Sequence, residues 1–163
     1  MNTLVVFHSR SGHTRQLADA IAKQMNAELS EIFERINRKG LLAYLRLGRD
    51  AWLGRKSEIL PTEKNVADFD LVIIGTPVWS GALSSPVRTY LEENVSRFKN
   101  VAFFCTMGGS GSERAFHQMQ VICRKAPLAT LTITERQLVN KSHMEAMSGF
   151  VAQLDLQMPK RGP

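Results

Sequence analysis

One stretch near the amino terminus constrains the fold of this chain more than any other. An apolar run, residues 4–7, is followed within two residues by the loop Ser9-Arg10-Ser11-Gly12-His13-Thr14, after which a helical pattern begins. Gly12 allows a tight turn, and the first amides of the following helix have no intrahelical partners. Because the helix dipole also favours an anion at that end, the stretch predicts a phosphate-binding loop between a strand and a helix. The alternative is an ordinary turn in which Ser and Thr cap the helix.

The rest of the chain repeats this alternation of strands and helices. Apolar or alternating runs predict five strands, at residues 3–8, 28–33, 70–75, 100–106 and 128–133, with helices between and after them. Strands that alternate with helices form a parallel sheet covered on both faces, with right-handed crossovers. We therefore predict a three-layer α/β sandwich with a five-stranded parallel sheet of order 2-1-3-4-5. Ser110 with Glu113, and Ser142 with Glu145, have the spacing of helix capping boxes.

The length and composition suit one domain. A chain of 163 residues can bury a sizeable core, and no repeat or linker divides it. We expect a single domain over residues 1–157 and a tail over 158–163. The longest apolar runs are only strand-length, and two cysteines are too few for a disulfide framework. We therefore expect a cytoplasmic protein with no transmembrane segment.

Three loops of the predicted sheet share an unusual composition. With the order 2-1-3-4-5, the loops after the first, third and fourth strands open at the same carboxyl edge, around the switch point of the sheet. These loops are residues 9–14, 76–85 and 106–111, and they are rich in Ser, Thr, Gly and Trp. Because three such loops meet at one edge, we predict the ligand site there.

Several phosphate-binding and catalytic motifs are absent. A dinucleotide fingerprint needs three glycines and a P-loop needs Lys after its last glycine, whereas the first loop has only Gly12, followed by His13. Residues 108–112 lack the final glycine of a nucleophile elbow, and the four histidines are too scattered to predict a metal site. We predict no catalytic side chain, so a bound cofactor is expected to supply the chemistry.

The three loops resemble those of one family. Residues 9–14 look like the phosphate loop of flavodoxins, and residues 75–81 resemble the second flavin loop of that superfamily. Together with residues 82–91, the second loop is closer to the flavodoxin-like NAD(P)H:quinone reductases, and residues 106–111 fit the third flavin loop. The resemblance spans roughly residues 3–155 and implies a flavodoxin-like fold with FMN bound non-covalently at the sheet edge.

The resemblance also implies roles for individual residues. Hydroxyls of the first loop and the amides of Gly12 and His13 would hold the phosphate, with Arg10 adding charge; Trp79 would pack on the isoalloxazine, and the glycines of the third loop would approach its pyrimidine edge. The alternatives are a structural Trp and a plain turn. The implied cofactor-binding residues are Ser9, Arg10, Ser11, Gly12, His13, Thr14, Pro77, Val78, Trp79, Ser80, Gly81, Thr106, Met107, Gly108, Gly109 and Gly111.

Two departures from flavodoxins bear on function. Many flavodoxins carry a flavin-stacking Tyr in the third loop, where this chain has Met107 and glycines, and flavodoxins are usually acidic, whereas this chain has a net charge of +6. Both departures favour an FMN-dependent oxidoreductase that passes electrons from NAD(P)H, with NADPH preferred, to a quinone or similar acceptor. The alternatives are a flavodoxin-type carrier that docks to redox partner proteins and a cofactor-free interaction module.

Much of the positive charge lies in one segment. Residues 34–56 contain seven basic and two acidic side chains, interleaved with leucines and Trp52 in the pattern of an amphipathic helix. The segment is interpreted either as a solvated helix packed on the sheet or as a docking surface. The docking partner would be an acidic protein, a second subunit of a homodimer or an anionic membrane surface.

Overall fold

The computed structural model describes residues 2–35 and 57–158. Its strands are β1 (Thr3–Phe7), β2 (Glu28–Glu31), β3 (Leu71–Trp79), β4 (Ala82–Leu83), β5 (Val101–Met107) and β6 (Thr130–Thr134). Its helices are α1 (His13–Met25), the 3₁₀ turn η1 (Val66–Asp68), α3 (Ser85–Asn94), α4 (Ser112–Cys123), α5 (Glu135–Val139) and α6 (Met144–Gln157). The predicted amphipathic helix at residues 34–56 falls almost entirely outside the described residues.

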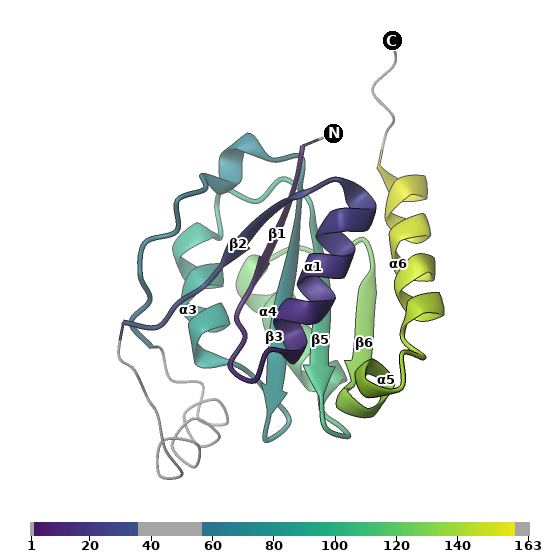
Figure 1. The fold of residues 1–163 in the computed structure, drawn as a ribbon. Coiled ribbons are helices and arrows are strands. Elements are labelled where there is room, and N and C mark those ends of the chain that lie inside the picture. Colours follow the sequence, from purple (N-terminus) through teal and green to yellow (C-terminus); the bar gives the residue numbers. More distant parts are fainter. Residues whose placement is uncertain (1, 36–56, 159–163) are drawn as a thin grey trace.

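The sheet has the predicted topology. Its parallel strands lie in the order β2-β1-β3-β5-β6, and β4 pairs antiparallel with β3 outside this path. The five predicted strands therefore occupy the predicted positions 2-1-3-4-5, and β4 is an addition. Figure 1 shows α1 and α6 in front of the sheet and α3 and α4 behind it, which makes three layers.

The alternation of side chains along β1 explains why both faces of the sheet are covered. Val5 and Phe7 belong to the core packed with α1 and α6, whereas Leu4 and Val6 belong to the core packed with α3 and α4. Successive side chains of a strand point to opposite faces, and every residue of β1 is buried. A strand that is apolar throughout therefore has to lie inside a doubly covered parallel sheet.

The second loop differs from the prediction because it contains a hairpin. Strand β3 continues past residue 75 to Trp79 and turns through Ser80 and Gly81 into β4, so that Trp79 pairs with Ala82. Both turn residues have positive φ, 50° at Ser80 and 70° at Gly81, as a two-residue hairpin of the I′ type requires. The predicted loop 76–85 is therefore partly sheet.

Both predicted capping boxes are wrong. Helix α4 begins after Gly111 and α6 after His143, and neither helix has a side-chain cap. The capping box lies instead at α5, where Thr134 and Gln137 exchange hydrogen bonds with each other's backbone. Loop geometry decided these caps, because the left-handed backbone at Gly111 starts α4 one residue later than Ser110 would.

Neither a membrane-spanning helix nor a cluster of metal ligands occurs among the described residues. None of the helices described is long and apolar enough to cross a membrane. In the same part of the chain, no group of three His, Cys, Asp or Glu side chains is placed to hold a metal ion.

Candidate functional site

The three predicted loops meet at the carboxyl edge of the sheet because their strands are in register. Phe7 at the end of β1 pairs with Gly75 of β3, and Pro77 of β3 pairs with Thr106 of β5. Strand β3 continues for two residues beyond Pro77, so Trp79 lies past the paired ends of the neighbouring strands. Each pair of loops is then joined by one direct contact between residues distant in sequence.

A hydroxyl pair joins the first loop to the third. The Oγ1 atoms of Thr14 and Thr106 lie 2.7 Å apart, and both residues are buried. One hydroxyl donates to the other, so the start of α1 is held against the end of β5. Thr14 was predicted to donate to a phosphate, whereas here its hydroxyl already has a protein partner.

Two glycines join the second loop to the third. A Cβ atom added to Gly111 would lie 2.4 Å from the Cα of Gly81 and 3.1 Å from Cγ1 of Val78. No other residue type can be accommodated at this distance without a backbone shift. Leu83, in the return strand of the second loop, is also held by α4, because its amide donates to Oε1 of Gln118 at 3.1 Å.

A pair of aromatic rings joins the first loop to the second. His8 lies perpendicular to Trp79, with ring centroids 5.9 Å apart and an interplanar angle of 88°. Its Nδ1 lies 2.8 Å from the carbonyl oxygen of Ile32, and its backbone amide donates to the carbonyl of Gly75. Burial lowers the pKa of His8 below its ordinary value, so the imidazole is neutral at neutral pH.

The amino end of α1 is open toward solvent. Gly12 caps it with a left-handed φ of 96°, no side chain caps the helix, and a Cβ added to Gly12 would meet no atom within 4 Å. The amide of Gly12 donates to Oγ of Ser9 at 3.2 Å, so this predicted phosphate donor has a protein partner here. Open helix amides and nearby hydroxyls are what an anion site at a helix amino terminus needs.

The other predicted site residues lie at the same edge of the sheet and differ in how far they are exposed to solvent. Pro77 and Thr106 are buried, and the half-buried residues are Ser9, His13, Val78, Trp79, Gly81, Met107 and Gly111. Arg10, Ser11, Gly12, Ser80, Gly108 and Gly109 are exposed. A Cβ added to Gly108 or Gly109 would also meet nothing within 4 Å, so the third loop borders open space on its outer side.

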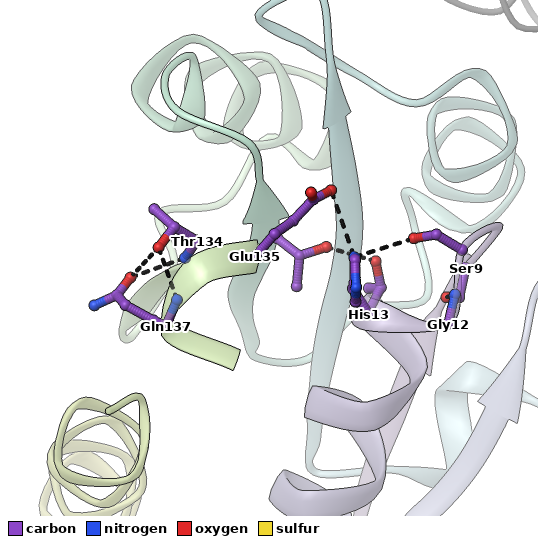
Figure 2. Close-up of polar contacts among 9 residues, drawn as sticks. Ser9, Gly12, His13, Thr134, Glu135 and Gln137 are labelled. Atoms are coloured by element: carbon purple, nitrogen blue, oxygen red, sulfur yellow. Dashed lines mark hydrogen bonds and ion pairs between the residues drawn. The ribbon is translucent and has the colours of Figure 1, made fainter. Parts of the chain in front are cut away.

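Sequence reasoning missed Glu135, which follows β6 and starts α5. Figure 2 shows its carboxylate directed at His13, with the Thr134–Gln137 capping box at the same helix end. Nδ1 of His13 lies 3.4 Å from Oε1 of Glu135 and 3.3 Å from Oγ of Ser11. The loop after the last strand was not expected to join the site, and no composition signal marks it.

His8 was also missed as a site residue, although a signal existed. It follows β1 directly and continues the alternation of Leu4 and Val6, which places its ring on the α3 side of the sheet. A histidine at such a position, immediately before a glycine-containing loop, can be singled out from the pattern alone.

The residues present fit a phosphorylated flavin. An uncapped helix end with exposed hydroxyls suits a terminal phosphate, the half-buried indole of Trp79 suits a flat ring, and the glycines of the third loop leave room beside it. The direct contacts between the loops hold these groups in fixed relative positions before any ligand binds. Such preorganisation lowers the entropy cost of binding.

Known structures share this architecture. A flavoprotein from Lactobacillus acidophilus NCFM, determined in complex with FMN, is 24% identical, with a TM-score of 0.69 over 86% of this chain and 97% of that one. A WrbA-like flavodoxin from Agrobacterium tumefaciens is 17% identical, with a TM-score of 0.58 over 93% and 94%. General stress protein 14 from Treponema denticola, in complex with FMN, is 15% identical, with a TM-score of 0.58 over 97% and 100%. These likenesses confirm the flavodoxin-like fold.

A family comparison adds the chemistry. No curated protein matches the chain. The model of one family, described as NADPH-dependent FMN reductase, matches residues 1–143, which is most of the sequence. This match confirms the predictions of a flavodoxin-like flavoprotein, of FMN as cofactor and of oxidoreductase chemistry. The chain belongs to the NADPH-dependent FMN reductase family.

Proposed function

We propose that this protein uses FMN, bound at the three-loop edge, to pass electrons from NADPH to a quinone or a similar small acceptor. The observation that carries the proposal is the set of three contacts that join the loops: Thr14 with Thr106, Gly81 with Gly111, and His8 with Trp79. These contacts hold the three loops together around the uncapped amino terminus of α1. When bound, FMN supplies the ability to accept a hydride and to release its electrons to an acceptor.

The first loop is the proposed phosphate site. Ser11 and Gly12 are exposed at the start of α1, where amides of the first turn are not capped by any side chain. Ser9 orients the loop by accepting a hydrogen bond from the amide of Gly12. The hydroxyl of Thr14 forms a hydrogen bond with Thr106 and so holds α1 against β5, rather than contacting the phosphate itself.

The second and third loops are the proposed ring site. Trp79 would cover one face of the isoalloxazine, and Met107, Gly108 and Gly109 would border the other. Because no side chain projects from the two glycines, a flat nicotinamide can reach that second face. Hydride transfer requires the two rings to approach to about 3–3.5 Å between the reacting atoms, so an uncovered face supports a reductase over a carrier.

The positive charge supports a phosphorylated donor. With a net charge of +6, the chain attracts polyanions such as NADPH, whose extra phosphate distinguishes it from NADH. This long-range term is screened over about 8 Å at physiological ionic strength. We therefore expect the preference for NADPH to weaken as salt is added.

The basic segment is the proposed docking surface. Residues 34–56 carry most of the excess positive charge, and their basic side chains are interspersed with apolar ones in the sequence. We expect binding to an acidic partner or to anionic vesicles to weaken with salt and after combined Arg46→Glu and Arg49→Glu substitution. Sedimentation that is unchanged by both treatments would contradict this docking role.

Anaerobic stopped-flow absorbance tests the proposed reaction. The protein is loaded with FMN, mixed with excess NADPH or NADH, and followed at the absorbance of oxidised flavin. We expect bleaching within seconds with NADPH, slower bleaching with NADH, and recovery of the absorbance when a quinone is then added. Free FMN at the same concentration is the control for reaction without protein.

One result would show a carrier instead. If neither nicotinamide bleaches the bound flavin over many minutes, but a flavodoxin reductase reduces it rapidly, the proposed enzyme activity is wrong. A purified protein that neither is yellow nor takes up FMN would contradict the cofactor site as well.

A further inference from the structure

We propose that His8 is a positioning residue that fixes the orientation of Trp79 and, through it, the packing of the indole on the flavin. The inference rests on the proposed function, because it assumes that Trp79 contacts the flavin. It assigns a role to a buried histidine that was not among the predicted site residues.

The hydrogen bonds of His8 define its tautomer. Nδ1 lies 2.8 Å from the carbonyl oxygen of Ile32, an atom that can only accept, so Nδ1 carries a proton and donates it. Ile32 is fully buried, and its own amide donates to the carbonyl of Phe7 at 2.7 Å. The imidazole is therefore fixed to the backbone between the ends of β1 and β2, and its orientation does not depend on solvent.

This fixed ring is the aromatic contact of Trp79. The two rings are perpendicular, with an interplanar angle of 88°, an arrangement favoured by the charge distribution of aromatic rings. Trp79 is half-buried at the last position of β3, next to Ser80 and Gly81, so its backbone alone leaves the indole free to rotate about its side-chain bonds. Within the described residues, His8 is the aromatic ring that packs against this indole, and it limits that rotation.

The surroundings keep His8 uncharged at neutral pH. Burial is the largest influence and lowers the pKa of His8. The hydrogen bond to the Ile32 carbonyl and the carboxylates of Glu34 and Glu31 raise this pKa, and Arg10 of the first loop lowers it further. Glu31 also forms an ion pair with Arg15, with Nη2 and Oε2 2.5 Å apart. Protonation would place a cation against the indole and would change both its orientation and its fluorescence.

The experiment uses Trp79 as its own reporter. Trp52→Phe leaves Trp79 as the single tryptophan of the chain. In this background, His8→Ala removes the ring and His8→Phe keeps a flat ring but removes the donor to Ile32. The matched control is His143→Phe, because His143 is also buried and its Nδ1 lies 3.1 Å from a backbone carbonyl, that of Gln137 in α5.

Three readouts separate positioning from folding. We expect FMN to quench Trp79 strongly in the parent, to quench it less in both His8 variants, and to bind the His8→Ala variant about twofold to tenfold more weakly. The midpoint potential of bound FMN should shift in both His8 variants. The His143→Phe variant can lose stability but should retain the parent's quenching and potential. Without FMN, Trp79 emission should change below pH 6.5, the ordinary pKa of histidine, in the parent and not in His8→Phe.

The outcomes distinguish the inference from the proposed function. Folded His8 variants whose quenching, potential and pH profile match the parent would overturn the role of His8 while leaving the proposed function intact. If the parent binds FMN without quenching of Trp79, the packing of Trp79 on the flavin is wrong, and the proposed role of His8 fails with it. If FMN does not bind at all, the proposed function fails, and the pH profile of Trp79 without FMN still decides whether His8 controls the indole.

Discussion

Gly12 and Gly111 have the same backbone conformation at the start of a helix, but their surroundings differ. Each is the N-cap of a helix, each has a left-handed φ, 96° and 106°, and neither helix has a side-chain cap. A Cβ added to Gly12 would meet nothing within 4 Å, whereas one added to Gly111 would lie 2.4 Å from the Cα of Gly81. One glycine leaves a helix terminus open, and the other closes a contact between two loops.

The comparison shows that an uncapped helix terminus is not by itself a ligand site. Both termini offer unpaired amides, yet at Gly111 the backbone of the second loop occupies the adjacent space. Only the first terminus combines free space at its capping glycine with an exposed hydroxyl, that of Ser11. We therefore expect substitutions at Gly111 to act mainly on stability and substitutions at Gly12 to act mainly on anion binding.

The largest effect is expected from Gly111→Ala. The new methyl group would overlap Gly81, and the left-handed backbone is itself unfavourable for Ala, so we expect a loss of about 2–4 kcal/mol in the free energy of unfolding. Urea unfolding measures the loss. Gly109→Ala is the control, because a Cβ there meets nothing within 4 Å. Equal stability of the two variants would mean that the Gly81–Gly111 contact does not constrain the loops.

Gly12→Asp is expected to weaken FMN binding at least about tenfold, or about 1.4 kcal/mol. The carboxylate would stand in the open space where the phosphate is proposed to bind, and like charges repel strongly near a protein surface. Gly12→Asn is the control, since both residues tolerate a left-handed backbone and nearly match in shape. Fluorescence titration of FMN measures the difference between the two variants. Equal affinities would show that the phosphate lies elsewhere.

Acid is expected to lower the free energy of unfolding through His8, and not through the contact between Gly81 and Gly111. The closed contact is built from Gly81, Gly111 and Val78, which do not titrate, whereas His8 lies directly before the first loop. Because the pKa of His8 is lowered on folding, the unfolded chain binds more protons as the pH falls below 6.5, the ordinary histidine value. The contribution of His8 is thus complete above that pH and is lost below it.

Unfolding free energies measured from about pH 8 to about pH 5 test this dependence. The parent should lose more stability over this range than His8→Phe, which has no group to protonate at that position. Parallel curves for the two proteins would mean that His8 is not buried in its neutral form.

The smallest effect is expected from Glu135→Gln. The carboxylate lies 3.4 Å from Nδ1 of His13 beside the open terminus, so its removal should raise FMN affinity by a few-fold at most, and more at low salt. Glu113→Gln is the control, since Glu113 lies exposed in the first turn of α4, at the closed terminus. The same gain from both variants would point to net charge alone rather than to the position of Glu135.

The predicted topology was confirmed because its signals are local. Strands β1, β3 and β5 each contain a continuous apolar run, and such runs alternating with helices allow few arrangements other than a doubly covered parallel sheet. The first loop could be singled out for the same reason, since Ser9 to Thr14 lie next to one another in the chain. The roles assigned to the individual cofactor residues stay predictions.

The capping boxes and the second loop were harder to predict. Ser110 and Ser142 satisfy the spacing of a cap, but spacing does not specify the backbone conformation that places a side chain over the helix end. Strand β4 consists of Ala82 and Leu83 alone, too short for a periodic pattern, and it exists because Ser80 and Gly81 adopt a hairpin turn.

The order of the strands, the two buried faces of the sheet and the polar loops at its carboxyl edge could all be predicted from the amino-acid pattern. These properties follow from periodicity and turn chemistry, which act between residues a few positions apart. The contacts of Thr14 with Thr106, Gly81 with Gly111, His8 with Trp79 and Glu135 with His13 could be found only in the folded protein. Each of these contacts joins chain segments far apart in sequence, which strand register and close packing bring together rather than local preference.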